Sequence, residues 1–477
     1  MLTSADNMSL RKTKIVATLG PATASSEIIG ALIEAGLNVA RINMSHAPHD
    51  WVRRIVRTVR EAAAARRTHI GLLMDTQGPA IRTGDLPSAL DLKPGQKFTF
   101  TVRGEKSEEL HSVDVNYDDL VNDISVGDVV LIDNGAIQMK VMAKRANRIE
   151  CEVLTPGVLG SRRHINLPGV KVNLPALTAK DLADVELGLE LHFDFIALSF
   201  VREAKDIRQL RAVTASTEAA PKIVAKIEDQ QAVQNIHEII READAVMVAR
   251  GDLGIECPYE ELPIIQRRVV KLCLQLGRPV IVATHMLESM IESPLPTRAE
   301  ITDVANAVFE QSDAIMLSGE TTVGKYPVKC VEVFDRISRR IERSGGANYH
   351  ERAELTKARE KLAKSGVVLA NELKADAILV FTWHGNLARY ASWMRPRNSP
   401  IYAFCQNDSV ARSLTLSWGV IPIVLQFDLV DPSKTLSAAM RLLTERGLLK
   451  TGNSIVVIGS VASGEELVDA LQMRVVA

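Results

Sequence analysis

The sequence predicts an α/β protein built on a (β/α)8 TIM barrel, with a small β-barrel lid domain inserted in it and an open α/β domain at the C-terminal end. Three observations lead to this prediction. Short apolar, β-branched runs alternate eight times with amphipathic helical patterns, as parallel strands and crossover helices do. A hairpin-like segment interrupts the alternation once. A second and shorter α/β pattern follows the last of the eight runs.

The eight runs are expected to form the strands of the barrel. They are Ile15–Thr18, Val39–Ile42, Ile70–Met74, Phe195–Leu198, Ile223–Ala225, Ala245–Val248, Val280–Ala283 and Ala314–Leu317. Apolar residues spaced three and four apart predict helices between them. These helical patterns include Ser25–Ala35, His49–Arg66, Lys180–Glu190, Glu260–Leu276 and Pro296–Phe309.

The interruption has the pattern of antiparallel β-structure. Turn dipeptides such as Pro94-Gly95 and Asn134-Gly135 separate its alternating apolar runs, which predicts a small antiparallel barrel or sandwich. The runs are Lys97–Val102, Val129–Ile132, Ile137–Val141 and Ile149–Leu154.

These patterns divide the chain into domains. We expect an N-terminal segment (1–11), the barrel (12–84 and 174–345), the inserted β domain (85–173) and a C-terminal α/β domain (346–477) that serves regulation and subunit contacts. The two barrel segments together come close to the roughly 250 residues typical of a TIM barrel. In the C-terminal domain the expected strands are Ala377–Phe381, Ile401–Phe404, Ile421–Leu425 and Ile455–Ile458.

Composition excludes several classes of protein. The 57 basic and 58 acidic residues leave a net charge of -1, and aromatic residues are only 4%, which argues against binding to nucleic acid or anionic membranes. No apolar stretch approaches the ~18 residues of a membrane helix. The five cysteines are scattered without a C-x-x-C pair, so we expect reduced thiols in a cytoplasmic protein.

Polar residues follow the predicted barrel strands directly, where TIM barrels carry their catalytic groups. Lys226 and Glu228 are two residues apart on an extended segment, so their side chains share one face. An exposed ion pair would explain this spacing equally well, except that charge at the end of a buried strand is costly without a role. Glu228 and Asp252 end neighbouring strands, and their oxygens predict a Mg2+ or Mn2+ site.

Other strand ends carry positive charge and hard oxygen atoms. Arg41 and Arg82 lie at the same rim, and two arginines beside a metal favour a substrate that bears phosphate. Gly251 either forms a plain turn or lets an anion approach the backbone. Four further residues either cap strand ends or bind a monovalent cation: Asn43, Ser45, Asp75 and Thr76.

Taken together, these residues suit phosphoryl or enolate chemistry. The set contains a metal site, a lysine and arginines, but no paired base for a serine or cysteine nucleophile. The inserted domain is hinged at both ends beside the barrel mouth, so we expect it to act as a lid that excludes water. The residues alone indicate this reaction class and not the substrate.

A set of sequence strings resembles the pyruvate kinase family in order and spacing. The strings cover nearly the whole chain and are densest in residues 11–84 and 220–330. They are RKTKIVATLGPA, NVARINMSH, DTQGPAIRTG, NLPG, AKIED, MVARGDLG, ATHMLESMI, PTRAEITDVANAV and IMLSGET. The resemblance implies transfer of phosphate from phosphoenolpyruvate to ADP, which yields pyruvate and ATP in the last step of glycolysis.

The resemblance also implies a role for each matching residue. Lys226 would stabilise the phosphoryl group in transfer and the enolate, and Thr284 would contact the substrate and lie on the route that protonates the enolate. Arg41 would anchor the phosphate. The expected Mg2+ ligands are Glu228 and Asp252, the substrate contacts also include Gly251, and the expected K+ ligands are Asn43, Ser45, Asp75 and Thr76. The expected nucleotide contacts are Arg82 and Arg163, which replaces a usual lysine. His46 is expected as a further nucleotide contact only because it follows Ser45 at the mouth.

Three properties stay open at this stage. Ala80 stands where K+-dependent members carry Glu and K+-independent ones carry Lys, so K+ dependence is undecided. Residues 382–388 resemble only part of the family's sugar-phosphate loop, which leaves the identity of any phosphorylated effector undecided. The family implies a homotetramer, whereas composition does not show one.

Two other functions compete with this interpretation. One is a metal-dependent aldolase-type barrel that forms a pyruvate enolate, although the insertion and Arg82 speak for a nucleotide lid. The other is a non-catalytic relative that binds an effector, although a lysine and two carboxylates would then converge without a purpose.

Overall fold

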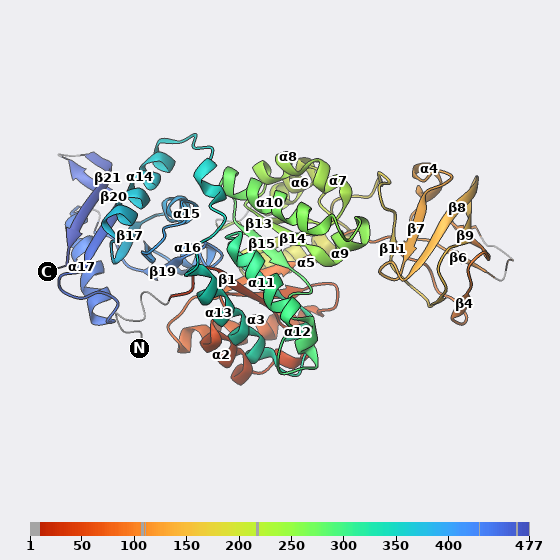
Figure 1. Ribbon diagram of the computed structural model, residues 1–477, viewed down its shortest axis with the longest axis horizontal. Coiled ribbons are helices and arrows are strands. Elements are labelled where there is room, and N and C mark those ends of the chain that lie inside the picture. Colours follow the sequence, from red (N-terminus) through yellow and green to blue (C-terminus); the bar gives the residue numbers. More distant parts are fainter. Residues whose placement is uncertain are drawn as a thin grey trace.

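The computed structural model describes residues 10–105, 109, 111–215, 219–428, 430–463 and 466–476, and gives no side-chain account of 461–463 and 466–467. The expected N-terminal segment 1–11 therefore lies outside the described residues, except for Leu10 and Arg11. Figure 1 shows three parts in a row. The C-terminal domain lies at one end, the barrel is in the middle, and the inserted β domain projects at the other end.

Eight parallel strands close the central barrel in the order β1-β16-β15-β14-β13-β12-β3-β2. They are β1 (Lys14–Thr18), β2 (Val39–Asn43), β3 (Gly71–Asp75), β12 (Phe195–Leu198), β13 (Lys222–Ile227), β14 (Ala245–Ala249), β15 (Val280–Ala283) and β16 (Ala314–Leu317). All eight predicted runs are confirmed as strands. Their apolar residues are buried both inside the barrel and under its helices, which explains why each run is continuously apolar.

Helices surround the barrel, and polar caps fix where several of them begin. They are α2 (Ser26–Ala35), α3 (His49–Ala65), α5 (Ala179–Glu190), α6 (Ala204–Thr214), α7 (Gln230–Gln234), α8 (Ile236–Glu242), α9 (Arg250–Glu256), α10 (Leu262–Leu276), α11 (Arg298–Phe309), α12 (Gly319–Thr322) and α13 (Pro327–Glu342). Thr297 caps α11 through a capping box with Glu300, so this helix begins two residues later than predicted.

The inserted domain is a β domain, as predicted. Six strands form a sheet in the order β11-β7-β8-β9-β5-β6, and β10 pairs with β4 in a separate two-stranded sheet. Isolated bridges connect the two edges of the six-stranded sheet through the segment before it, because Arg82 pairs with His164, just before β11, and Thr83 pairs with Val115, just after β6. The elements are β4 (Leu90–Leu92), β5 (Lys97–Thr101), β6 (Ser112–Asp114), α4 (Leu120–Asp123), β7 (Val129–Ile132), β8 (Ile137–Arg145), β9 (Arg148–Val153), β10 (Gly157–Leu159) and β11 (Ile165–Asn166).

The C-terminal domain is a five-stranded sheet in the order β19-β18-β17-β20-β21 with helices against it. The elements are α14 (Ala358–Leu373), β17 (Ala377–Phe381), α15 (Asn386–Trp393), β18 (Ile401–Cys405), α16 (Asp408–Ser413), β19 (Val420–Val424), α17 (Pro432–Glu445), β20 (Ser454–Ser463) and β21 (Glu466–Val475). The sequence analysis did not predict β21, which pairs antiparallel with β20 along its whole length. The residue boundaries between domains stay a prediction that these elements support.

The two smaller domains lie at opposite ends of the barrel strands. Asp194 and Asp313 precede β12 and β16, and they accept hydrogen bonds from Arg412 at 2.9 Å and Arg395 at 2.7 Å of the C-terminal domain. The C-terminal domain thus packs against the amino ends of the strands. The inserted domain leaves and rejoins the barrel at the carboxyl ends, where the site lies (Figure 1).

Candidate active site

A cavity of about 380 Å³ opens at the carboxyl ends of the barrel strands, between the barrel and the inserted domain. Its lining comes from the ends of β2, β3, β12 and β13, from the start of α9, and from the inserted domain. Nine residues selected from the sequence line it together: Arg41, Asn43, Ser45, Thr76, Arg82, Arg163, Lys226, Glu228 and Asp252.

The ammonium group of Lys226 is the most heavily contacted charge in this cavity. Its Nζ lies 2.8 Å from Glu228 Oε1 and 3.1 Å from Asp75 Oδ1, and it donates to Ser199 Oγ at 2.8 Å. Only 10% of the side chain is exposed. Burial by itself lowers the pKa of Lys226, but Asp75, Glu228 and Asp252 outweigh burial and hold the pKa above its ordinary value. The ammonium therefore stays charged.

Arg41 and Asp75 complete this charged cluster on the neighbouring strands. Arg41 donates through Nε to Asp75 Oδ2 at 2.6 Å and through Nη1 to Thr18 Oγ1 at 2.8 Å. Burial raises the pKa of Asp75, but Arg41 and Lys226 outweigh this effect and leave it lowered. Asp75 therefore contacts Arg41 with one carboxylate oxygen and Lys226 with the other. Asp75 itself does not line the cavity.

Two residues after β12 belong to the site, although the sequence analysis did not select them. Ser199 accepts the hydrogen bond from Lys226 and donates to Thr76 O at 2.7 Å. The backbone N–H of Phe200 donates to Glu228 Oε2 at 2.6 Å, and Phe200 has a positive φ of 53°. The signal was present, because Ser199 directly follows the fourth predicted strand just as the selected residues follow the others.

Thr284 and Gly251 are held together at the side of the cavity, although neither lines it. The N–H of Gly251 donates to Thr284 Oγ1 at 2.6 Å. The buried Arg250 donates to the carbonyl of Thr284 and to Asp303 Oδ1, both at 2.6 Å. These bonds fix a turn in which Thr284 has a φ of 71°, a left-handed conformation that is rare outside glycine.

The inserted domain supplies the opposite wall. Arg82 donates to the carbonyl of Arg162 at 3.1 Å, and Arg163 donates to Asp133 Oδ1 at 3.3 Å. His46 is exposed and does not line the cavity. Predicted nucleotide contacts thus reach the cavity at Arg82 and Arg163, whereas His46 lies outside it.

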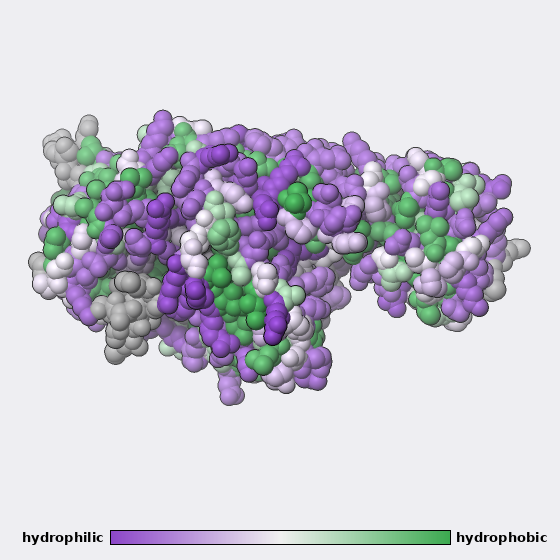
Figure 2. All heavy atoms as spheres, viewed as in Figure 1, coloured by the Kyte–Doolittle hydropathy of each residue, from purple (hydrophilic) through white to green (hydrophobic). Residues whose placement is uncertain are grey.

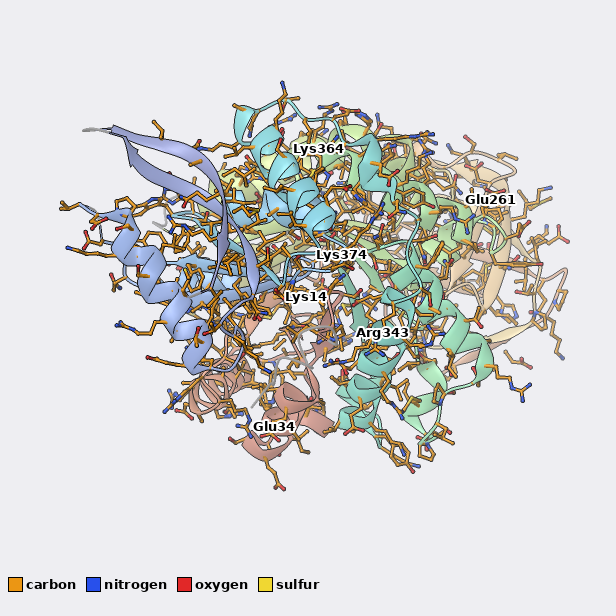
Figure 3. All side chains as sticks on the ribbon, turned by 60° about the vertical axis from the view of Figure 1, so that its left-hand side comes forward. Lys14, Glu34, Glu261, Arg343, Lys364 and Lys374 are labelled. Carbon is orange, nitrogen blue, oxygen red and sulfur yellow. The ribbon has the colours of Figure 1, made fainter. Side chains whose placement is uncertain are left out.

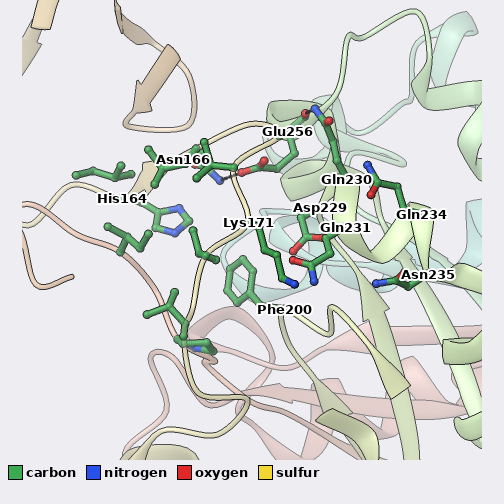
Figure 4. Close-up of a pocket in the computed structure, with 18 residues that line it drawn as sticks. His164, Asn166, Lys171, Phe200, Asp229, Gln230, Gln231, Gln234, Asn235 and Glu256 are labelled. Carbon is green, nitrogen blue, oxygen red and sulfur yellow. Dashed lines mark hydrogen bonds between the residues drawn. The ribbon is translucent and has the colours of Figure 1, made fainter. Parts of the chain in front are cut away.

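A second pocket, of about 300 Å³, lies at the hinge beneath the inserted domain (Figure 4). Asn166 of β11 donates to Glu256 Oε1 of α9 at 2.8 Å, as the dashed line in Figure 4 shows. Phe200 lines this pocket and also the cavity above the strands. Phe200 therefore separates the hinge pocket from the cavity. A movement of the inserted domain at the hinge would displace a residue that lines the cavity.

Glu228 and Asp252 both line the cavity as candidate ligands for a divalent cation, although among the described residues no group of three or more His, Cys, Asp or Glu side chains is placed to hold one. In the part of the chain that the structure describes, the Asp252 carboxylate has no hydrogen bond or ion pair, and it lines the cavity together with Glu228. Burial raises the pKa of Glu228, Lys226 opposes that effect, and Asp252 adds to it. Two carboxylates with this unfavourable repulsion provide the hard oxygens that Mg2+ prefers.

Comparisons with known proteins agree with this geometry. The family model "Pyruvate kinase, barrel domain" matches residues 10–331, and "Pyruvate kinase, alpha/beta domain" matches residues 360–472. The chain is 42% identical over 458 residues to "Pyruvate kinase isozyme G, chloroplastic" of Nicotiana tabacum, which covers 95% of this chain and 81% of that protein. It is 41% identical over 467 residues to the pyruvate kinase of Geobacillus stearothermophilus, with coverage of 95% and 78%. A solved pyruvate kinase from Cryptosporidium parvum superposes with a TM-score of 0.93 at 35% identity and covers 100% of this chain and 98% of its own.

The fold and the site define a phosphotransferase built on a TIM barrel. The chain belongs to the pyruvate kinase family, and its reaction is that of the family: phosphoenolpyruvate and ADP give pyruvate and ATP. Enzymes of this family need divalent cations. The alternatives of an aldolase-type barrel and a non-catalytic relative are therefore set aside.

A substitution at Gly78, in the loop after β3, would test how tightly the cavity wall formed by Ser199 and Phe200 is packed. Its φ is 71°, and an added Cβ would lie 2.9 Å from Ser199 Cβ and 2.8 Å from Phe200 Cδ2. We predict that Gly78→Ala displaces the partners of Lys226 and Glu228 and lowers kcat by about 100-fold, as small misplacements of catalytic groups do. Steady-state kinetics measure this effect.

Gly95 provides the matched control for Gly78. It has a φ of 80° with nothing within 4 Å of an added Cβ, so Gly95→Ala introduces the same backbone strain without a collision. Equal kcat values for the two variants would contradict the proposed packing of the wall.

Proposed function

We propose that Lys226 offsets the negative charge of the phosphoryl group as it moves from phosphoenolpyruvate to ADP, and that of the enolate left behind. One observation carries this proposal: a permanently charged, nearly buried ammonium group lies in the cavity wall, held by Asp75, Glu228 and Ser199. A fixed cation in a site of low dielectric stabilises developing negative charge without reorganisation. Catalysis by positioning and charge is the pattern expected for phosphoryl transfer.

Arg41 anchors the phosphate of phosphoenolpyruvate in this proposal. Its guanidinium is already oriented by Asp75 and Thr18, so little side-chain freedom is lost when an anion binds. Gly251 and Thr284 contact the substrate beside it, and the hydroxyl of Thr284 lies on the path by which the enolate is protonated. The hydroxyl accepts a hydrogen bond from the N–H of Gly251 and donates one to the carbonyl of Ala283, both at 2.6 Å, while Arg250 fixes the backbone carbonyl of Thr284.

The nucleotide binds against the inserted domain. Arg82 and Arg163 line the cavity from that side and provide two guanidinium groups for the phosphates of ADP. His46 contributes only from the exposed rim, outside the lining. Closure of the inserted domain over the hinge then excludes water during transfer.

Glu228 and Asp252 hold the divalent ion, which we propose is Mg2+, with Mn2+ as a substitute. When bound, such an ion supplies Lewis-acid stabilisation of phosphoryl oxygens. The protein's part is to present two carboxylates and to keep Lys226 charged beside them.

Replacing Lys226 tests its role directly. We predict that Lys226→Met lowers kcat by about 100- to 1000-fold, the cost of removing one group that stabilises transition-state charge. A coupled assay with phosphoenolpyruvate, ADP and Mg2+ measures the change. Lys222, at the other end of the same strand, is the control: Lys222→Met should retain activity. Turnover of Lys226→Met equal to that of the wild type would refute the role.

Binding of Mg2+ should depend on pH through Glu228. Burial raises the pKa of this carboxyl to about 7 from an ordinary 4.5, so the ion-free protein loses stability as pH rises through that range and the carboxyl ionises. Because Mg2+ needs the ionised form, its affinity should be about tenfold higher at pH 8 than at pH 6. Thermal midpoints with and without Mg2+ report this, since the ion stabilises only the folded chain.

Two variants make the pH experiment specific. Glu228→Gln should abolish the pH-dependent response to Mg2+. Burial also raises the pKa of Glu256, a partly exposed glutamate, to about 7, but Glu256 lies at the hinge pocket and outside the cavity. Glu256→Gln should keep the response, and a loss of the response in both variants would refute the assignment to Glu228.

A K+ site formed by Asn43, Ser45, Asp75 and Thr76 accompanies the metal in this proposal. Ala80 lines the cavity and brings no ammonium group there that could replace the ion. We predict that activity falls several-fold when K+ is exchanged for tetramethylammonium at constant ionic strength. Unchanged rates would exclude a functional K+ site.

We also propose a cytoplasmic homotetramer that responds to a phosphorylated effector. The five cysteines are free, which suits a reducing compartment. Within the described residues no helix is both long and apolar enough to cross a membrane. Figure 2 shows apolar atoms gathered in the middle of one face, and α11 leaves Ile301 and Phe309 exposed, which supports contact between subunits. Light scattering tests the tetramer, and cell fractionation tests the location.

A further inference from the structure

Two side chains connect the inserted domain directly to the barrel at the hinge pocket. Asn166 is the last residue of β11 in the inserted domain, and Glu256 is the last residue of α9 on the barrel. The Nδ2 atom of Asn166 donates to Glu256 Oε1 at 2.8 Å (Figure 4). We call this hydrogen bond between Asn166 and Glu256 the hinge bond.

On the side of the inserted domain, the backbone of Asn166 is fixed by strand pairing. Asn166 pairs with Leu131 of β7, and the N–H of the preceding Ile165 donates to the carbonyl of Ile81 at 2.8 Å. Asn166 is only 5% exposed, and its Oδ1 atom is buried with no hydrogen-bond partner in the described part of the chain. The side-chain amide is therefore oriented by its bond to Glu256 alone.

On the side of the barrel, the carboxylate of Glu256 depends on the same bond. Among the described residues it has no ion pair, and the hydrogen bond from Asn166 is the one that it accepts. The backbone carbonyl of Glu256 accepts a bond from Gln230 Nε2 of α7, which fixes this end of α9. A partly desolvated carboxylate that loses its only donor is costly, so both partners favour the hinge bond.

The helix α9 connects the hinge bond to the cavity. Asp252 lines the cavity near the start of α9, and Glu256 follows one helical turn later. The start of the helix is fixed to the end of β15, because the N–H of Gly251 donates to Thr284 Oγ1 at 2.6 Å. The hinge bond therefore holds the inserted domain against the helix that carries a candidate metal ligand.

Two views of the whole molecule agree with this placement. In Figure 1, α9 lies at the end of the barrel nearest to the inserted domain. In Figure 3, Glu261, which follows α9, lies on the side of the inserted domain, whereas Lys14 and Lys374 lie toward the C-terminal domain. The hinge bond is thus remote from the contacts that attach the C-terminal domain.

The segment that ends in Asn166 also carries the arginines of the proposed nucleotide site. Arg163 lies in this segment, and Arg82 pairs with His164 beside it. Both arginines line the cavity opposite Asp252. A rotation of the inserted domain at the hinge would therefore move the two guanidinium groups relative to Asp252.

We propose that Asn166 and Glu256 are positioning residues for phosphoryl transfer, because the hinge bond sets how the arginines of the inserted domain face Asp252 across the cavity. Neither Asn166 nor Glu256 lines that cavity. The inference rests on the proposed nucleotide site at Arg82 and Arg163. Without the hinge bond, the inserted domain spends less time in the arrangement that transfers the phosphoryl group.

An exchange of donor and acceptor tests the hinge bond. Asn166→Asp places a carboxylate opposite Glu256, and we expect kcat to fall and KM for ADP to rise, each by about tenfold. KM for phosphoenolpyruvate should change by no more than about twofold, because the proposed phosphate anchor Arg41 belongs to the barrel. Steady-state kinetics with each substrate varied in turn measure this split.

The double variant Asn166→Asp/Glu256→Gln provides the rescue. It again places a donor opposite an acceptor and has the same net charge as the wild type, so most of both losses should be recovered. Loss of fold stability alone would not be repaired in this way. If Asn166→Asp does not fold, Glu256→Leu removes the acceptor without adding charge and should give the same kinetic split.

Gln234→Glu is the matched control for the added charge. Gln234 lines the same hinge pocket and makes no hydrogen bond among the described residues, so this change adds a carboxylate there and leaves the hinge bond intact. It should have wild-type kcat and KM. A kinetic loss in Gln234→Glu as large as that in Asn166→Asp would overturn the proposal.

Hydrogen–deuterium exchange of the ligand-free protein gives a readout that does not depend on activity. Amides of residues 164–172 should exchange about tenfold faster in Asn166→Asp and return to the wild-type rate in the double variant. Arg82→Gln, assayed in parallel, separates the two proposals: an unchanged KM for ADP there would contradict the nucleotide site, and kcat and amide exchange would then decide on the hinge bond. Wild-type kcat and exchange in Asn166→Asp, or no recovery in the double variant, would overturn the inference.

Discussion

The site depends on one cluster of charges: the ammonium of Lys226 between Asp75 and Glu228, with Arg41 on the far side of Asp75. Each of these groups would be costly to bury alone, because a charge removed from water needs a partner. Together they keep the lysine charged and orient the arginine, while the repulsion between Glu228 and Asp252 is left for a cation to relieve. The four groups lie on or directly after β2, β3 and β13 of one barrel, in which only β12 separates β3 from β13.

The barrel separates two tasks by using its two ends. The polar residues of the site follow the strands at their carboxyl ends, and the inserted domain forms the opposite wall of the cavity. At the amino ends Asp194 and Asp313 fasten the C-terminal domain through Arg412 and Arg395. Lys14 reaches across the same boundary to the carbonyl of Val420 at 2.7 Å, and burial lowers its pKa to about 7. Chemistry and domain attachment thus do not compete for the same residues.

Much of this arrangement could be predicted from sequence because its signals are local. Buried parallel strands are apolar throughout, so all eight runs could be located, and the polar residues that follow several of these strands line the cavity. Residues whose role depends on tertiary contacts could not be predicted from the sequence. Nothing in the sequence distinguishes Ser199 from other serines, because its role comes from the contact with Lys226 at 2.8 Å. Phe200 contributes only a backbone N–H, which any residue other than proline could provide. β21 carries no distinctive pattern of its own, and it forms a strand because β20 offers an edge. His46 follows a strand end like the others, but its side chain faces outward.

The protonation state of Lys226 tests the account most directly. NMR of the protein with ¹³C-labelled lysine, assigned through Lys226→Met, follows the Cε resonance as pH rises. The account predicts that Lys226 remains protonated when exposed lysines begin to titrate near their ordinary pKa of 10.5. A resonance that titrates below that value would mean that desolvation outweighs the surrounding carboxylates, and the fixed charge on which the proposed catalysis depends would be absent.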